Sequence, residues 1–241
     1  MKIRIKFAKY GAMKFIGHLD MMRFFQKAIR RAGIDVKYSA GFSPHQIMSF
    51  ASPLGVGLES TGEYMDIEVN SMTTTEALKE ALNGAMVEGV EILSVGVLPD
   101  TVKNAMASVA AASYRLQSKN GAFAIPNPEE TVCAFYAQET IPYTKETKKS
   151  VIQLDLKQGI YDVRMETGAS LFMTVNASSS GNIKPSMVFE KLCEFAGAEI
   201  PAAAYQITRL ETYTDLAGEG APHRFVPLSA CCTEESQAEC Y

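Results

Sequence analysis

Residues 15–68 hold the side chains of this chain that are best suited to chemistry. Two of the three histidines, His18 and His45, lie in this stretch together with Asp20 and Tyr38. An imidazole near a carboxylate or a hydroxyl is the usual material of acid–base catalysis. These four side chains are therefore the candidate catalytic residues. Each histidine also has a simpler interpretation, because His18 can fill the start of a helix and His45 can be an ordinary loop residue.

The segment from residue 39 to residue 60 reads SAGFSPHQIMSFASPLGVGLES, and it is rich in glycine and proline but poor in charge. This composition is typical of loops around a short strand. Gly41 and Gly55 would let backbone N–H groups approach a ligand closely. We expect a contact surface for a ligand or RNA here, with the candidate binding residues Tyr38, Ser39, Gly41, Phe42, Pro44, His45, Ser49 and Phe50. Their aromatic rings, with Phe7, could stack on bases or belong to the core.

Positive charge is concentrated at the start of the chain. Residues 1–50 carry ten Lys and Arg against two Asp, a formal charge of +8, while the other 191 residues carry 13 basic and 25 acidic side chains, or −12. A segregated basic segment suggests an anionic partner, with nucleic acid as the first candidate. The alternative is that the acidic remainder of the same molecule neutralises this segment.

Residues 18–32 predict an amphipathic helix, since apolar residues recur at helical spacing. Its charged residues share an arc of about 100°, and they are Asp20, Arg23, Lys27, Arg30 and Arg31. Gly33 suits the end of the helix, and the basic last turn suits the helix dipole. Four cations on one face exceed what this requires, so Arg23, Lys27, Arg30 and Arg31 are candidate binding residues.

The predicted fold class is α+β, with two domains. Residues 1–99 predict a ferredoxin-like βαββαβ domain, with strands at 2–8, 34–38, 63–69 and 90–98, a further short strand at 47–50, and helices at 18–32 and after the capping box Thr73–Glu76. Residues 108–214 predict a second ferredoxin-like α+β domain, with strands at 110–118, 151–156, 160–166, 171–175 and 205–213 and helices at 128–137 and 185–196. Residues 215–241 predict a flexible tail.

Composition and cysteine spacing exclude several classes. Apolar residues make up 47% of the chain, which is enough for ordinary cores. No apolar run could span a membrane, and the charged start lacks a signal-peptide pattern, so we expect a cytoplasmic protein. The five cysteines include no CxxC pair and no CxxxCxxC triplet, so we expect no metal and no cofactor in this chain. Cys231, Cys232 and Cys240 are expected in a reduced tail, with metal binding as the alternative.

The run HLDMMRFFQKAIRRAGIDVKYSAGFSPHQIMSFASPLGVGLESTGEYMDIEV resembles the radical SAM-associated (radical SAM-linked) protein family, a domain of unknown function. The matching positions are His18, Asp20, Arg23, Arg30, Arg31, Tyr38, Ser39, Gly41, Phe42, Pro44, His45, Ser49, Phe50, Pro53, Gly55, Glu63, Tyr64 and Asp66. Gly17 stands where a serine is common, so a side-chain N-cap is expected to be missing. Later in the chain, residues 181–188 resemble the family's G.(I/V)RP..V pattern more loosely. Lys184 stands there where an arginine is common, and it is a further candidate binding residue.

The resemblance implies a radical SAM protein as partner, because family members are often fused to one or encoded beside one. The hypothesis is a non-enzymatic accessory module that binds RNA or another anionic substrate through the basic first domain. One alternative is a scaffold that docks on an acidic protein without binding nucleic acid. Another is a metal-independent RNA-processing enzyme that uses His18 or His45, an analogy at fold level only. The sequence predicts no oligomeric state.

Overall fold

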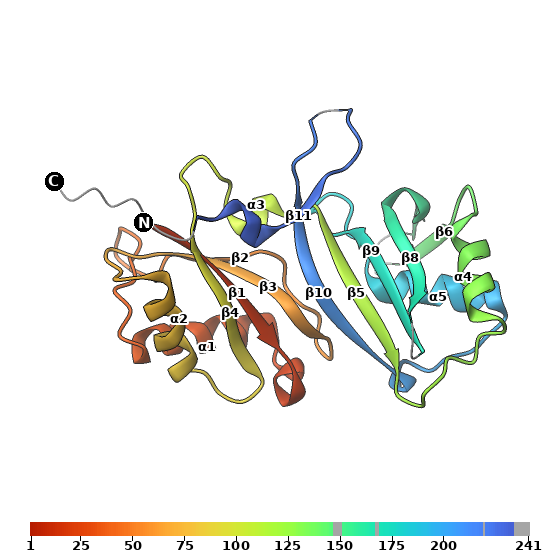
Figure 1. Ribbon diagram of the computed structural model, residues 1–241, viewed down its shortest axis with the longest axis horizontal. Coiled ribbons are helices and arrows are strands. Elements are labelled where there is room, and N and C mark those ends of the chain that lie inside the picture. The colour runs from red at the N-terminus through yellow and green to blue at the C-terminus, as the bar shows by residue number, and fades with distance from the viewer. Residues whose placement is uncertain (147–150, 167–168, 219, 234–241) are drawn as a thin grey trace. The chain divides into compact units, whose positions relative to one another are not determined.

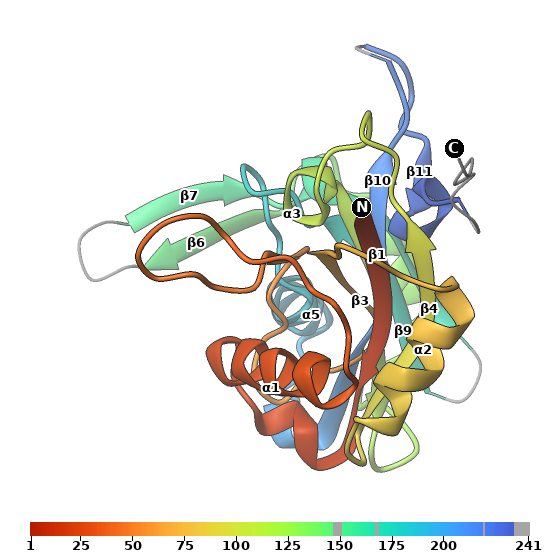
Figure 2. The ribbon, with the colours of Figure 1, turned by 90° about the vertical axis from the view of Figure 1, so that its left-hand side faces the viewer.

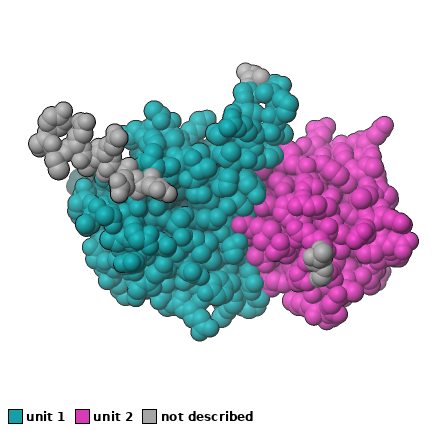
Figure 3. Space-filling view, in the orientation of Figure 1, with its two compact units in different colours: residues 1–109, 211–241 teal, residues 110–210 magenta. Residues whose placement is uncertain are grey.

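The computed structural model describes residues 1–146, 151–166, 169–218 and 220–233. Within these ranges, five α-helices and eleven β-strands form an α+β fold (Figure 1). The chain divides into two compact units, which Figure 3 colours separately. Unit 1 consists of Met1–Val109 and Glu211–Tyr241, and unit 2 of Ala110–Leu210. Among the described residues, no helix has both the length and the apolar composition that crossing a membrane requires.

Unit 1 is built on antiparallel strands that two helices connect. In chain order its main elements are β1 (Lys2–Lys9), η1 (Gly11–Phe15), α1 (His18–Arg31), β2 (Met48–Phe50), β3 (Glu59–Glu68), α2 (Thr75–Gly84), β4 (Val90–Val97) and α3 (Ala105–Ser108). β1 lies between β3 and β4, and β2 pairs with β3. These positions confirm most of the elements expected in residues 1–99, while the ferredoxin-like arrangement of both halves stays a prediction.

The core of unit 1 follows from two periodicities. Alternate residues of β1, namely Ile3, Ile5 and Phe7, are buried on one face of the strand. Phe25 and Ile29 of α1 lie one turn apart and are buried in the same cluster. The ring of Phe25 packs edge-on against Phe7, with 4.8 Å between ring centroids. The helix therefore buries its apolar stripe on the strand face that carries the odd-numbered residues.

The ends of the two helices agree with their local sequence. Gly17 is the N-cap of α1 and makes no side-chain cap, as the departure from the family's serine predicts. Gly33 follows the helix with φ +67°, a conformation that glycine adopts without steric cost. For α2 the cap lies one residue later than expected, because the side chain of Thr74, and not Thr73, accepts a hydrogen bond from Ala77 N.

The strand expected at residues 34–38 is wrong. Only isolated bridges form there, Val36 with Val69 and Tyr38 with Gln46. The chain turns back on itself after Tyr38, so the two bridges face different partners and no continuous ladder can form. The alternation of side chains over residues 34–38 does not indicate this change of pairing partner.

The end of unit 1 differs from the flexible tail expected from residue 215. The second part of β10 (Tyr205–Asp215), β11 (Phe225–Pro227) and η4 (Leu228–Cys231) all belong to this unit. β11 pairs with β10, and the side chain of Leu228 is fully buried. Three paired residues are too few to show an alternating pattern in a sequence, which is why this return escaped the prediction. Cys240 lies outside the described residues.

Unit 2 spans residues 110–210, close to the expected second domain. Its elements are β5 (Ala111–Ser118), α4 (Pro128–Tyr136), β6 (Pro142–Glu146), β7 (Val151–Asp155), η2 (Lys157–Gly159), β8 (Ile160–Glu166), β9 (Ser170–Asn176), α5 (Pro185–Ala196), η3 (Ala202–Ala204) and the first part of β10. β9 pairs antiparallel with both β5 and β8. β6 and β7 form a separate hairpin, and β6 was not predicted.

Two thiols are expected to react slowly with alkylating reagents in the folded protein. Burial raises the pKa of Cys193 and of Cys232 from 9.0 to about 11, and the thiolate is the form that reacts. Near neutral pH each thiol is therefore about 100-fold less ionised than an unperturbed one. We expect iodoacetamide to label exposed Cys133 first, and all three cysteines at similar rates in concentrated urea, as measured by peptide mass spectrometry. Equal labelling of Cys193 in both conditions would contradict this.

Candidate functional site

Much of the positive charge of residues 1–50 is neutralised within unit 1. Five of its ten cations form ion pairs with carboxylates from later in the chain, namely Lys2–Asp100, Arg4–Asp66, Lys6–Glu211, Lys14–Glu59 and Lys37–Glu68. Lys9 is buried and donates to Ile16 O at 2.6 Å, and burial lowers its pKa. For the five paired cations, neutralisation by the acidic remainder of the same molecule is confirmed.

The other cations lie on α1. Arg23 pairs with Asp20 at 3.2 Å, where both side chains are exposed. Lys27, Arg30 and Arg31 are all exposed, and none of the three forms an ion pair with a carboxylate of the described residues. Their positive charge therefore remains available to a ligand. We call Arg23, Lys27, Arg30 and Arg31 the cationic face of α1.

The loop of residues 38–46 follows, and it exposes two aromatic rings. Tyr38 has an exposed fraction of 47%, and Phe42 one of 110%, so the ring of Phe42 is open to solvent on all sides. Gly41 has φ +110°, which permits the sharp turn before this ring. Two backbone hydrogen bonds close the loop, from Ser39 N to His45 O at 2.8 Å and from Ile47 N to Lys37 O at 2.9 Å.

The loop and the cationic face meet at one backbone carbonyl. Gln26 O in α1 accepts a hydrogen bond from Arg30 Nε and another from Gln46 Nε2, each at 3.2 Å. Gln46 is buried, and its Oε1 has no hydrogen-bond partner among the described residues. Figure 2 shows the orange loop after α1 passing beside the helix. We call the cationic face and this loop together the α1–loop surface.

The four candidate catalytic residues do not converge. His18 packs edge-on against Phe50, with 5.3 Å between ring centroids, and Asp20 pairs with Arg23. His45 Nδ1 lies 2.8 Å from Ser39 Oγ. In the described part of the chain no hydrogen bond or ring contact joins His18, Asp20, Tyr38 and His45 to one another. A nucleophile, a base and a third group that orients the base are therefore not assembled.

Contacts with Ser39 hold His45 within the loop. Ser39 Oγ accepts from His45 N at 3.1 Å, and it lies 2.8 Å from His45 Nδ1, where the tautomer of the imidazole decides which atom donates. His45 Nδ1 also lies 3.5 Å from Ser43 O. These contacts orient the ring within the loop, and the residue as a whole is exposed.

Two expected binding residues belong to the strand and not to the loop. Phe50 packs edge-on against Phe7 and Phe25, with centroid distances of 6.1 and 5.8 Å. Phe7 is therefore buried in the core of unit 1, and Phe50 is partly buried against it. Base stacking by Phe50 stays a prediction. Ser49 is half-buried in β2 opposite Asp66. Tyr38, Ser39, Gly41, Phe42, Pro44 and His45 remain on the α1–loop surface.

Asp66 is buried, and it forms an ion pair with Arg4. Its carboxylate accepts from Arg4 Nε at 2.8 Å and Arg4 NH2 at 3.0 Å, and also from Ala105 N at 2.6 Å. Arg4 has an exposed fraction of only 2%, and it also donates to Leu228 O and Lys103 O. The Arg4 side chain of β1 is thus covered in part by the end of unit 1.

Sequence reasoning missed a second polar cluster beside this pair. Tyr64 Oη donates to Glu211 Oε1 at 2.8 Å and lies 3.2 Å from Ser229 Oγ, while Lys6 Nζ is 2.6 Å from Glu211 Oε2. Burial and the charge of Glu211 raise the pKa of Tyr64 well above its usual range. Glu211 and Ser229 follow Tyr64 by 147 and 165 positions, so no local spacing could signal the cluster.

The third histidine, His223, has a carboxylate partner. His223 Nδ1 lies 2.6 Å from Asp215 Oδ2, and its ring stacks on Phe225. Asp215 accepts from Ala217 N and Arg224 N as well. The pKa of Asp215 is lowered, chiefly by the hydrogen bond from His223. These contacts fasten the chain between β10 and β11, which is a structural task.

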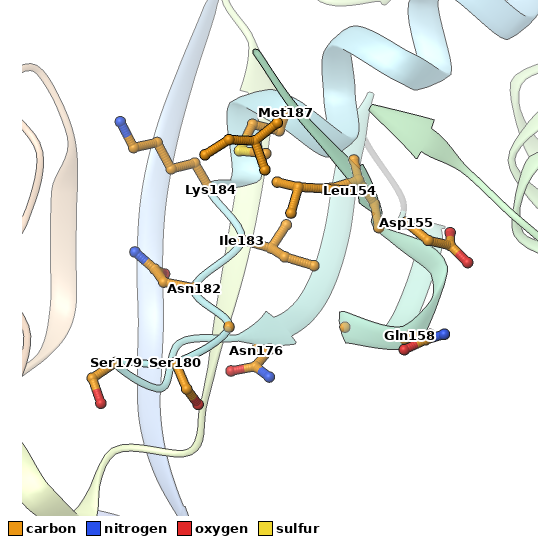
Figure 4. Close-up of a pocket in the computed structure, with 14 residues that line it drawn as sticks. Leu154, Asp155, Gln158, Asn176, Ser179, Ser180, Asn182, Ile183, Lys184 and Met187 are labelled. Atoms are coloured by element: carbon orange, nitrogen blue, oxygen red, sulfur yellow. The ribbon is translucent and has the colours of Figure 1, made fainter. Parts of the chain in front are cut away.

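Lys184 lies in unit 2, at the rim of a cavity of about 520 Å³. It is the N-cap of α5. Figure 4 shows Leu154, Ile183 and Met187 facing one another while the amine of Lys184 extends away from them. A Cβ on Gly159 would lie 2.4 Å from Ile183 Cδ1, so close packing explains this glycine. Apolar side chains line one part of the cavity, and Ser179, Ser180 and Asn182 belong to the same lining. Ligand binding by Lys184 stays a prediction.

Comparisons with known proteins match a family over most of the chain. Residues 2–185 match the family model described as "Uncharacterized protein conserved in bacteria (DUF2344)". No curated protein matches. Among matching solved structures is "Crystal Structure of a Cbf5-Nop10-Gar1 Complex", with 8% identity and a TM-score of 0.45 over 87% of this chain and 48% of that chain. This chain thus spans about half the length of the matched one, and similarity at that level carries no functional information.

Proposed function

We propose that this chain, which belongs to the bacterial DUF2344 family, is a non-catalytic accessory module that binds RNA through the α1–loop surface. The observation that carries the proposal is the absence of carboxylate partners for Lys27, Arg30 and Arg31 among the described residues, beside two exposed aromatic rings. Five other cations of residues 1–50 form ion pairs with carboxylates from later in the chain, so α1 offers an external anion the uncompensated charge of this segment. Phosphates supply that charge, and bases supply faces for the rings.

A radical SAM enzyme is the proposed partner, because the run from His18 to Val69 resembles the radical SAM-associated family. The partner would carry the iron–sulfur cluster and S-adenosylmethionine, and this chain would hold RNA for it in the cytoplasm. We also interpret unit 1 as ferredoxin-like, since β1 lies between β3 and β4 and β2 pairs with β3.

Reversing the charge of α1 is expected to abolish RNA recovery from cells. The test compares the tagged native protein with a Lys27→Glu/Arg30→Glu/Arg31→Glu variant, after crosslinking and sequencing of the bound RNA. Each phosphate that the protein no longer neutralises lowers the salt dependence of binding by about 0.7 in the log–log slope. A variant that fails to neutralise three phosphates therefore shows a slope about 2 smaller in vitro.

The matched control is Lys79→Glu/Lys103→Glu/Lys119→Glu, which makes the same change in net charge outside the α1–loop surface. We expect the control to bind the same RNA as the native protein. Loss of RNA from both variants would assign the effect to net charge alone. Recovery of no RNA above background with the native protein would overturn the proposal.

A protein-docking scaffold is the second candidate, and one observation favours it. Phe15 at the end of η1, Leu19 at the start of α1 and Val56 in the loop after β2 are exposed apolar residues. The loop is held near Phe15, because Gly57 N donates to Lys14 O at 2.9 Å. An acidic protein that covers these residues would resist competition by polyanions, whereas RNA binding would not. The catalytic alternative has only the Ser39–His45 pair in its favour.

A further inference from the structure

We infer that the α1–loop surface selects single-stranded over double-stranded RNA, with an unpaired base stacked on the ring of Phe42. The inference rests on the proposed function and adds the class of substrate to it. It begins from the exposure of Phe42, whose fraction of 110% means that the folded protein covers none of the ring. In the part of the chain that the structure describes, no other ring contacts Phe42.

The side chain of Phe42 does not belong to the core that stabilises unit 1. The core of this unit is closed by other rings, with Phe7, Phe25 and Phe50 packed against one another. A large apolar side chain in water has lost the burial that usually stabilises it. A ligand with a flat apolar face can restore that burial, and every nucleic-acid base has such a face.

Hydrogen bonds restrain the backbone of the loop that carries the ring. Its ends are joined by the bonds Ser39 N to His45 O and Ile47 N to Lys37 O, and the side chains of Ser39 and His45 are joined inside it. A ring on a closed turn loses less conformational freedom on binding than one on an open chain. Gly41 and Pro44 flank the turn, where glycine permits its positive φ and proline restricts the backbone.

The loop that carries Phe42 is anchored beside the cationic face of α1. Arg30 and Gln46 share the acceptor Gln26 O, so the loop ends next to the cationic face. A strand that runs along α1 can contact Lys27 and Arg30 through phosphates and turn a base toward Phe42. In a duplex the bases are stacked on each other and paired, and the major groove of A-form RNA is too narrow to admit side chains. A duplex therefore offers charge to α1 but no face to Phe42.

The experiment measures fluorescence anisotropy with one labelled RNA of about 12 nucleotides, a length within the usual site size of such surfaces. The RNA is used as a single strand and as a blunt duplex with its complement. The proteins are the native chain, Phe42→Ala, Phe42→Trp and the Lys27→Glu/Arg30→Glu/Arg31→Glu variant. Thermal unfolding of each variant is recorded first, and Phe42→Ala is expected to unfold at the native temperature because the ring contacts no core residue.

We expect the native protein to bind the single strand about 10-fold more tightly than the duplex, within the range for one stacked base. Phe42→Ala should lose about that factor for the single strand and leave duplex binding unchanged, while Phe42→Trp should retain the preference. Equal native affinity for both forms, with loss of both in the α1 variant, would overturn this inference and leave the proposed function intact. Binding of neither form by the native protein would overturn both.

Discussion

Asp66→Ala is expected to lower the free energy of unfolding by about 3–5 kcal/mol, the usual cost of removing one partner from a buried ion pair. The variant leaves the guanidinium of Arg4 almost fully buried without its two carboxylate bonds. It also leaves Ala105 N without its acceptor. Urea denaturation followed by circular dichroism would measure the change as a lower midpoint at constant slope.

The double variant Arg4→Met/Asp66→Leu separates the ion pair from simple packing. Apolar side chains of similar volume often replace a buried ion pair without net loss, so the double variant should be more stable than Asp66→Ala. If Asp66→Ala unfolds at the native midpoint, water must reach Arg4, and the burial of the pair would be contradicted.

Ending the chain after Ala221 is the second change with a large expected effect. It removes β11 and η4, and with them Leu228, whose buried side chain alone is worth about 1.5–3 kcal/mol. Arg4 loses the acceptor Leu228 O, and Tyr64 loses Ser229. We expect a total loss of at least about 3 kcal/mol, measured as a lower unfolding midpoint or as insoluble protein.

A chain that ends after Thr233 is the matched control for this truncation. It keeps every described contact of β11 and η4, including the two backbone hydrogen bonds that join Thr233 and Val97. We expect the control to unfold at the native midpoint. Equal stability of both shortened chains would mean that the covering of Arg4 and Tyr64 contributes nothing to unit 1.

Elements with a clear periodicity could be predicted from the sequence. α1 has both an apolar stripe and a glycine after its last turn, and β1 alternates over eight residues. The failures lie where pairing depends on distant segments. Val36 is a β-branched residue, a type that favours strands, but it forms only one isolated bridge. β11 has three residues, which are too few for an alternating pattern. Local sequence describes the preference of a segment and not its partner.

The candidate site was predicted in part for the same reason. The composition around Phe42 and Gly41 indicates an exposed loop, and helical spacing places Arg23, Lys27 and Arg30 on one face. Residue types do not tell which cations find carboxylates. Arg4 and Lys6 alternate with apolar residues as surface charges would, yet Asp66 and Glu211 neutralise them. The uneven charge of the chain was thus a poor guide to the site. Only the three-dimensional structure shows that Lys27, Arg30 and Arg31 have no carboxylate partner among the described residues.

Unit 1 is built from two separate stretches of the chain, so its parts are synthesised at different times. The ribosome releases Arg4, Tyr64 and Asp66 early, but Leu228 and Ser229 follow only after the whole of residues 110–210. At about 5–20 residues per second, roughly 10–30 s pass between the two events. Unit 2 can complete its fold in this interval, while the sheet of the first half waits uncovered. Residues 225–231 therefore complete a unit whose other strands are synthesised much earlier.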